Sequence, residues 1–308
     1  MTAMVVGEVL VDLVWRGGER TIEPHAGGSP ANVAIGLHRL DHPVRFTTSW
    51  GDDPPGDLIA EHLAGAGVVV DQTPAASDRT LVALAYVDED SGSARYDFLG
   101  DWAPLRIDVP LEVTLLQTGS LAIVKEPGAA RVREAARTVR NRPGGIVAVD
   151  LNVRPAAQPD RAAYRESVHA MVREADVVKA SDEDLAWLYP DTSPERAARA
   201  LLERGPRLAV VTCGGAGAYG VMDGAQAWCA PPAVDVVDTI GAGDSFQAAL
   251  LSQLWCSTPG GGHTVSFPED EHALTQLLRR AVTAGALACE RAGAQPPTSI
   301  ELQAALAC

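Results

Sequence analysis

Asp238-Thr239-Ile240-Gly241-Ala242-Gly243-Asp244-Ser245-Phe246 is the most informative motif in the chain. It follows a Val-rich run, 234–237, that predicts a strand, and it opens a segment that predicts an amphipathic helix over Gly243–Leu254. Small residues at 241–243 let consecutive backbone N–H groups converge at the start of this helix, and such a nest binds anions. Asp244 would then either deprotonate a hydroxyl beside a bound phosphate or simply cap the helix.

Alternating strand and helix patterns extend from this motif over the whole chain. Short runs rich in Val, Leu and Ile alternate with segments of helical periodicity, which predicts βαβ units and a mainly parallel sheet covered by helices. We expect strands at Met4–Val6, Val44–Thr48, Leu115–Val124, Ile146–Leu151, Val177–Lys179 and Leu208–Thr212. We expect helices at Pro30–Leu40, Gly56–Gly65, Ala129–Arg140, Asp160–Glu174, Glu183–Leu188, Pro194–Arg204 and Ala273–Arg291. No linker interrupts the alternation, so residues 1–308 are expected to form one domain.

Two segments interrupt the alternation with a strand, turn and strand pattern. They are residues 9–23 and 81–99, and the second carries turn-forming residues at 88–92. Such hairpins either form a lid over a cleft or serve as plain edge strands. The glycine-rich segment Pro259–Pro268 is expected to be a loop.

A second glycine site, Gly27-Gly28-Ser29-Pro30-Ala31-Asn32, precedes a predicted helix. Backbone there can approach a ligand closely, and Asn32 can both donate and accept hydrogen bonds. The alternative is a tight turn with a solvated Asn. Asp12 is an acid among apolar residues, and its side chain is either exposed at a sheet edge or in contact with a bound polyol.

A third glycine site, Thr212–Gly220, contains a formal GxGxxG pattern at Gly215, Gly217 and Gly220. A dinucleotide-binding turn needs a helix directly after it, whereas the next residues, 221–228, predict a hairpin with Asp-Gly at its turn. The sequence therefore argues against an NAD-linked oxidoreductase. A Walker A loop is excluded because the chain contains no Gly-Lys pair.

Composition narrows the class of ligand. The formal net charge is −15, which disfavours binding to nucleic acid or to an anionic membrane surface. The five cysteines are widely spaced and form no zinc-like cluster, which indicates reduced thiols. No apolar run reaches the roughly 18 residues of a membrane span, and the N-terminus does not resemble a signal peptide. We therefore expect a cytoplasmic protein with a small-molecule substrate.

The glycine signatures at 27–32 and 238–246 resemble those of the ribokinase-like, or PfkB, carbohydrate kinases, whose second signature reads DTxGAGDxF. The segments 118–127, 150–154 and 179–184 are similar to those of the fructokinase branch, with Leu151 in place of the usual Pro and Asp184 in place of Glu. The resemblance implies a doubly wound α/β fold with a small β lid, and ATP-dependent phosphorylation of a sugar hydroxyl, most simply of fructose.

Carried over by motif, the resemblance implies a role for each matching residue. Asp244 would be the base, with Gly241, Ala242 and Gly243 as the anion hole. The sugar contacts would be Asp12, Gly27, Gly28, Asn32, Asn152 and Arg154. The nucleotide contacts would be Lys179, Ser181, Thr212, Gly214 and Gly217, and the metal ligands Asp184 and Asp238.

The expected cofactors are ATP and Mg²⁺, with a monovalent cation such as K⁺ as a further candidate. A homodimer is the open alternative to a monomer. Within the same family, 2-keto-3-deoxygluconate kinase, ribokinase and nucleoside kinase remain alternatives to fructokinase. A catalytically inactive sugar- or nucleotide-binding protein is the alternative from another class, although the presence of Asp244 and the complete glycine nest disfavours it.

Overall fold

The computed structural model describes residues 1–87, 94–258 and 262–307. The main sheet has the strand order β13-β12-β11-β10-β9-β8-β1-β4-β5. Strands β11 through β5 in this order are parallel, and β12 and β13 extend the sheet antiparallel beyond β11. The bounds are β1 Thr2–Val6, β4 Val44–Thr48, β5 Val69–Gln72, β8 Val113–Gly119, β9 Ile146–Asp150, β10 Val177–Ser181, β11 Leu208–Thr212, β12 Ala218–Met222 and β13 Ala225–Cys229.

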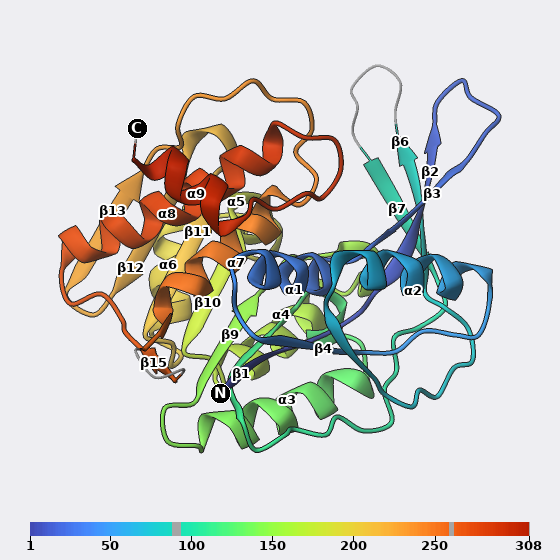
Figure 1. The fold of residues 1–308 in the computed structure, drawn as a ribbon, viewed down its shortest axis with the longest axis horizontal. Coiled ribbons are helices and arrows are strands. Elements are labelled where there is room, and N and C mark those ends of the chain that lie inside the picture. Colours follow the sequence, from blue (N-terminus) through green and yellow to red (C-terminus); the bar gives the residue numbers. More distant parts are fainter. Residues whose placement is uncertain (88–93, 259–261, 308) are drawn as a thin grey trace.

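Helices cover both faces of this sheet, as Figure 1 shows. One apolar core lies under α1 Ser29–Arg39, α2 Pro54–Ala66, α7 Ala242–Leu254, α8 Glu271–Cys289 and α9 Ser299–Leu306. A second core lies under α3 Gly128–Arg140, α4 Arg161–Val172, α5 Asp182–Leu188 and α6 Pro194–Leu202. The central strands are buried on both faces, which explains their continuous apolar runs. The predicted doubly wound, mainly parallel fold is confirmed.

A small second sheet rises from one end of the molecule (Figure 1). Its strand order is β3-β2-β6-β7, where β2 is Leu10–Arg16, β3 Glu23–Gly27, β6 Val82–Val87 and β7 Ala94–Leu99. The hairpin predicted at 81–99 forms the antiparallel pair of β6 and β7. The one predicted at 9–23 was placed too early, because its second strand, β3, begins only at Glu23 and extends to Gly27. Strands β2 and β6 join the two hairpins in parallel. The turn predicted at 88–92 lies outside the described residues. The predicted β lid is thus built from both sequence segments that interrupt the α/β alternation.

Several predicted elements are wrong in detail. The strand expected over Leu115–Val124 ends at Gly119, because Ser120–Ile123 forms a 3-10 helix, η1, whose backbone N–H groups at 121 and 122 donate to the buried Glu8 carboxylate. The Val-rich run 234–237 forms no strand; instead the Val237 and Asp238 N–H groups donate to the Cys289 carbonyl.

Other differences concern short elements near the surface. Part of the loop expected at 259–268 forms β15 His263–Val265, which pairs with β14 Trp255–Ser257, and residues 259–261 lie outside the described part of the chain. The helix α9 and the edge strand β5 were not predicted. The hairpin expected after the third glycine site is confirmed as β12 and β13, which face each other across a short turn. In the described ranges, no helix combines the length and apolarity needed to cross a bilayer.

Candidate active site at the carboxyl edge of the sheet

The predicted site residues converge because parallel strands end at one edge of the sheet. Lys179 of β10 is in register with Asp150 of β9, and Asp150 is in register with Gly119 of β8. On the other side, Ser181 of β10 is in register with Thr212 of β11. Ligands of open α/β sheets bind outside this carboxyl edge. The N-termini of α1 and α7 meet at the same place through a direct contact between their side chains.

That contact joins the two glycine signatures. The Ser29 hydroxyl donates to Asp244 Oδ1 at 2.6 Å, and Asn32 Nδ2 donates to Asp244 Oδ2 at 2.8 Å. The residues are more than 200 positions apart in sequence. Both carboxylate oxygens therefore have a donor, so that the side chain of Asp244 is fixed at the junction of α1 and α7. A pure helix cap would need no such partners from another helix.

The start of α7 has the backbone geometry of an anion nest. Gly241, the N-cap residue, has a φ of 75°, in the left-handed region that favours glycine. A Cβ atom at Gly241 would lie 2.6 Å from the Cβ of Ala294, so the close approach of residue 294 also requires glycine. The first N–H groups of a helix have no partners within the helix, and at this end they carry the positive side of the helix dipole.

A buried ion pair lies beneath the nest. Lys179 Nζ donates to Asp150 Oδ2 at 2.8 Å, and both side chains are nearly inaccessible to solvent. A Cβ atom at Gly243 would lie 3.0 Å from Lys179 Nζ, which places the ammonium directly against the first turn of α7. Lys179 was expected to contact nucleotide, and the structure brings it to the anion nest.

The two predicted metal ligands are each oriented by backbone donors. Asp184 Oδ1 accepts from the Val153 N–H at 2.7 Å, and its Oδ2 accepts from the Ser181 N–H at 2.9 Å, in a capping box with the Ser181 hydroxyl. Asp238 accepts from the Ile240 and Gly293 N–H groups at 3.0 and 2.8 Å. In the described ranges, no cluster of three or more His, Cys, Asp or Glu side chains has the arrangement of a metal site.

The predicted sugar contacts gather between the lid and β9. Asp12 of β2 lies opposite β3, and a Cβ atom at Gly27 would be 3.0 Å from Asp12 Oδ2. Burial raises the pKa of Asp12 to about 6, and the positive charge of Arg154 opposes this rise. Asn152, two residues after β9, has a φ of 36°, a conformation that Asn tolerates better than most residues. Gly28 has a φ of 116° and lies against the Glu8 carbonyl.

The third glycine site forms the far end of the same edge. Gly214 begins a short 3-10 turn, η3 Gly214–Ala216, and a Cβ atom there would meet open space. Gly217 must be glycine for a packing reason, because a Cβ atom would lie 2.1 Å from the Cys229 carbonyl oxygen. No long helix follows the turn, since β12 begins at Ala218. The structure therefore agrees with the rejection of a dinucleotide-binding fingerprint.

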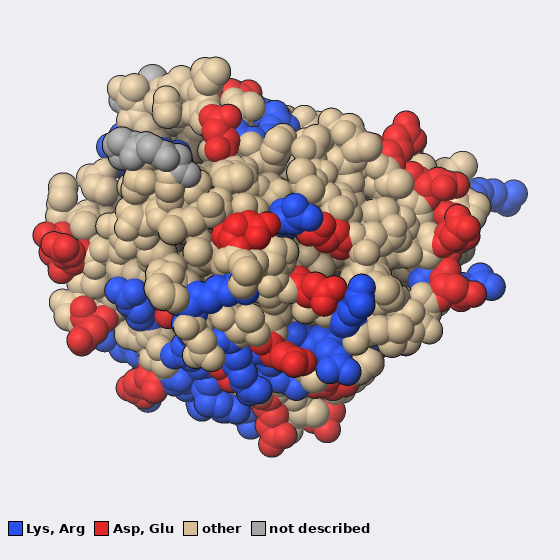
Figure 2. All heavy atoms as spheres, turned by 60° about the horizontal axis from the view of Figure 1, so that its bottom comes forward, with Lys and Arg blue, Asp and Glu red and all other residues tan. Residues whose placement is uncertain are grey.

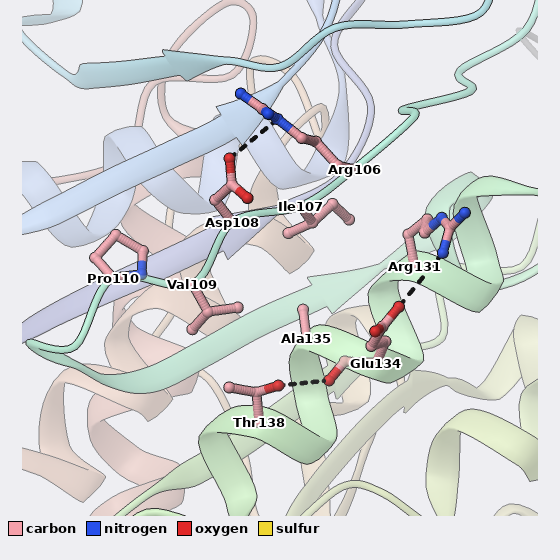
Figure 3. A pocket seen from close by; sticks show the side chains of 9 residues that line it. All are labelled: Arg106, Ile107, Asp108, Val109, Pro110, Arg131, Glu134, Ala135 and Thr138. Atoms are coloured by element: carbon pink, nitrogen blue, oxygen red, sulfur yellow. Dashed lines mark hydrogen bonds and ion pairs between the residues drawn. The ribbon is translucent and has the colours of Figure 1, made fainter.

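A surface hollow lies elsewhere, between α3 and the segment that precedes β8. Its volume is about 560 Å³, and none of the predicted site residues lines it. Figure 3 shows that its charged side chains are paired with each other, Arg106 with Asp108 at 3.1 Å and Arg131 with Glu134 at 3.5 Å. Because these charges are already matched, the hollow offers no group for catalysis.

Three residues of the site were not predicted as functional. Ser29 lies within the first glycine signature, and Asp150 lies within the segment 150–154 that is similar to the fructokinase branch, but neither residue was assigned a role. Tyr96 of β7 lies near Asp12 and Arg154. Burial raises the pKa of the Tyr96 phenol, the charge of Asp12 raises it further, and the charge of Arg154 lowers it. The alternation of Tyr96 and Phe98 with polar neighbours was a signal that both face the cleft side of the lid.

Comparison with known proteins identifies the family of the chain. The model of the pfkB family carbohydrate kinases matches residues 2–301. A fructokinase from Klebsiella pneumoniae is 33% identical, with 98% of each chain covered. One from Rhizobium leguminosarum bv. trifolii is 32% identical, with 80% of this chain and 78% of the relative covered.

Solved structures give the same result. Xylella fastidiosa fructokinase with bound ATP has a TM-score of 0.84 at 26% identity, covering 99% of this chain and 98% of that one. A double mutant of Vibrio cholerae O395 fructokinase, with fructose, ADP and potassium ion bound, has a TM-score of 0.80 at 27% identity and the same coverage. The chain belongs to the pfkB family of carbohydrate kinases.

Proposed function

We propose that this kinase transfers the γ-phosphoryl group of ATP to a hydroxyl of fructose, with Asp244 as the general base. The observation that carries the proposal is the contact of Asp244 with Ser29 and Asn32. It places a carboxylate where the first glycine signature, with its sugar-binding residue types, meets the nest at the start of α7. The fructokinase names of the relatives support fructose as the acceptor.

The geometry suggests a simple phosphoryl transfer. Asp244 accepts the proton of the attacking sugar hydroxyl, the sugar oxygen forms a bond to the γ-phosphorus, and the bond from that phosphorus to the β,γ-bridging oxygen breaks to release ADP. The N–H groups at Gly241 and Gly243 face the negative charge on the phosphoryl oxygens. The Ala242 N–H now donates to the Thr239 carbonyl at 3.3 Å, so it would join them only by exchanging or sharing this partner. A sugar hydroxyl bound beside Asn32 would replace or share one of the donors that now occupy Asp244.

Each predicted contact has a place in this scheme. Asp12, Gly27, Gly28, Asn32, Asn152 and Arg154 surround the space between the lid and β9, which we assign to the sugar. Lys179, Ser181, Thr212, Gly214 and Gly217 follow the strand ends towards α8, which we assign to the nucleotide. Polar groups at fixed positions along such an edge suit a polyol at one end and a polyphosphate at the other.

We further propose that Mg²⁺ binds with the triphosphate near Asp184, and a monovalent cation near Asp238. Each oxygen of Asp184 accepts one backbone N–H, which leaves lone pairs for a metal that keeps several waters. When bound, Mg²⁺ would neutralise phosphate charge. We expect excess EDTA to abolish turnover and added Mg²⁺ to restore it, as measured by ADP release. Undiminished turnover in EDTA would contradict this part of the proposal.

We also propose a homodimer formed through the outer face of the lid. Trp15 and Leu99 on this face are 41% and 55% exposed, and Trp15 packs against Tyr86. Arg95 and Asp97 on the same face carry opposite charges, which suits a two-fold interface. Sedimentation should give a dimer for the wild type and a monomer for Trp15→Arg, with the exposed Trp228→Arg as the control.

A cytoplasmic location, where ATP is available, is part of the proposal.

A substrate panel tests the proposed activity. ADP release should be measured with fructose, other ketoses and aldoses, nucleosides and 2-keto-3-deoxygluconate. We expect the highest kcat/KM for fructose, because the acidic carbohydrate would need a cationic clamp in an acidic protein. A higher kcat/KM for the keto acid would reject fructose and direct attention to Arg154 as that clamp. Arg95, by contrast, lies over the Tyr86 ring on the outer face of the lid, away from Asp12.

A further inference from the structure

Asp150 and Lys179 form an ion pair in the interior of the protein, at the end of two adjacent strands. They are 1% and 4% exposed. Lys179 is one of two lysines in the chain, and a buried ammonium ion is rare unless it is paired. Removing two charges from water is costly, so such a pair is weak evidence for stability and calls for another explanation.

The environment of Lys179 keeps it charged. Burial alone would lower its pKa, but the neighbouring Asp150, Asp184 and Asp244 reverse the effect, and the pKa is raised. Asp150 supplies both the closest charge and the hydrogen bond. Burial also raises the pKa of Asp150, to about 6, so that near neutral pH the two side chains form an ion pair.

Gly243 shows where this charge acts. Any Cβ atom at that position would lie 3.0 Å from Lys179 Nζ, so the absence of a side chain lets the ammonium reach the first turn of α7. The backbone nest and the Lys179 ammonium are therefore adjacent, and both can act on an anion bound at the start of α7. Asp150 Oδ2 bonds to the lysine, and Oδ1 has no hydrogen-bond partner among the described residues.

We propose that Asp150 is a positioning residue for phosphoryl transfer, whose carboxylate holds the Lys179 ammonium against the first turn of α7, where the γ-phosphoryl group is bound. This inference rests on the proposed function. Lys179 keeps its proton throughout and adds a buried positive charge to the nest. Asp150 acts only through Lys179 and does not touch the substrate.

Asp150→Asn tests the proposal because it keeps the shape and removes the charge. We expect kcat to fall about 10- to 100-fold, the range of partners that orient a charged site group, while KM for sugar changes little. In calorimetry, the variant should bind the Mg²⁺ complex of a non-hydrolysable ATP analogue about tenfold less tightly, with ADP binding nearly unchanged. Asp176→Asn is the matched control, because Asp176 lies just before β10 at the opposite edge of the sheet and bonds to the Val147 N–H.

A double-mutant cycle tests whether Asp150 acts through Lys179. Asp150→Asn should change kcat less than threefold when Lys179→Met is already present. An equal loss in both backgrounds, or kcat of Asp150→Asn within twofold of wild type, would overturn the proposal. If Asp150→Asn fails to fold, the uncharged pair Asp150→Asn with Lys179→Met is compared with Lys179→Met alone. Equal kcat then supports the proposal, and a further tenfold loss rejects it.

The calorimetric binding measurement tests this inference independently of the proposed sugar kinase activity. If the wild type phosphorylates no sugar, the proposed activity is wrong, yet the ratio of ATP-analogue to ADP affinity still reports on Asp150. An unchanged ratio in folded Asp150→Asn would count against the positioning role even where sugar turnover is normal in the wild type.

Discussion

At the scale of single residues, the function depends most on the carboxylate of Asp244. Asp244→Asn keeps the size of the side chain but cannot draw a proton from the hydroxyl, so we expect kcat to fall by roughly 10²–10⁴. The affinities for ATP and sugar should stay within a few-fold of wild type. Steady-state kinetics and calorimetry on the same preparation measure both.

The control for Asp244→Asn is Asp57→Asn, which changes an exposed acid in the first turn of α2. If Asp244 only completes the first turn of α7, the two variants should behave alike and retain activity. Asp244→Asn that turns over at more than about a tenth of the wild-type rate, against that general-base range, would argue against the base.

The residue types of the site were predictable, but their partners were not. A carboxylate after a glycine nest is a local pattern, and so is the Asn that follows two glycines. The bond between Asn32 and Asp244 joins helices on separate βαβ units, and no local pattern specifies it. Lys179 and Asp150 likewise meet only because β9 and β10 are adjacent and in a particular register.

At the scale of elements, the start of α7 can be tested through its glycines. Gly241→Ala should be destabilised by about 1–2 kcal/mol for the left-handed conformation, and by a further 1–3 kcal/mol, roughly, for overlap with Ala294. Gly293→Ala is the matched control, since its φ of 72° is similar and its Cβ atom would meet open space. Urea unfolding of both variants separates the two costs. Equal losses would show that Ala294 moves away.

The lid sheet is the element expected to respond to ligands. Tyr96 of β7 lies next to Asp12, and in the described part of the chain β6 and β7 belong to the small sheet and pair with no strand of the main sheet. We expect amide exchange in Val82–Val87 and Ala94–Leu99 to slow when sugar and an ATP analogue bind together. Peptides from α3 provide the reference. Exchange that stays unchanged at saturation would remove the lid from the mechanism.

Helices and strands were predicted correctly from sequence where a hydrophobic pattern extends over many residues. The prediction failed where a polar side chain from a distant part of the chain binds the backbone. The eight predicted helices all form. Helices such as α3 and α6 bury one apolar stripe, whereas α7 is buried at every residue from Ser245 to Ser252, with α1 and α8 packed against it. The strand expected through Val124 stops at Gly119 because a buried carboxylate, Glu8, pairs with the backbone that follows. Apolar runs alone cannot reveal such a partner more than 100 residues away.

At the scale of the whole molecule, charge is unevenly distributed. Figure 2 shows Lys and Arg side chains gathered on the face that carries α3, although the chain as a whole is acidic. Arginines of α3 pair with acids, Arg133 with Glu126 at 2.7 Å and Arg137 with Glu174 at 2.8 Å. These pairs offset much of the positive charge, which supports a small-molecule substrate over a polyanionic partner.

The stability of the whole molecule should also depend on pH through its buried acids. Glu8 is 1% exposed, and burial raises its pKa from an ordinary 4.5 to about 7, against hydrogen bonds from Ser120 and from the backbone of η1. Below pH 4.5 it is protonated in both the folded and the unfolded chain. As the pH rises, the unfolded chain loses this proton first, so the stability that Glu8 contributes is lost between about pH 4.5 and 7.

Glu8→Gln should abolish this contribution, because the amide stays neutral throughout this pH range. The Leu121 and Ala122 N–H groups donate to different oxygens of Glu8, whereas the amide has one acceptor oxygen. The lost hydrogen bond lowers stability equally at every pH, so it does not change the pH dependence. The free energy of unfolding of Glu8→Gln, minus that of wild type, should therefore increase by about 3 kcal/mol between pH 4.5 and 8. Other titrating groups, including Asp12, change in both proteins and cancel in the difference. Urea unfolding at matched pH measures it, with Glu61→Gln, an exposed acid on α2, as the control. A difference that stays constant across this range would show that Glu8 is ionised in the folded protein, and that η1 is held by a buried charge.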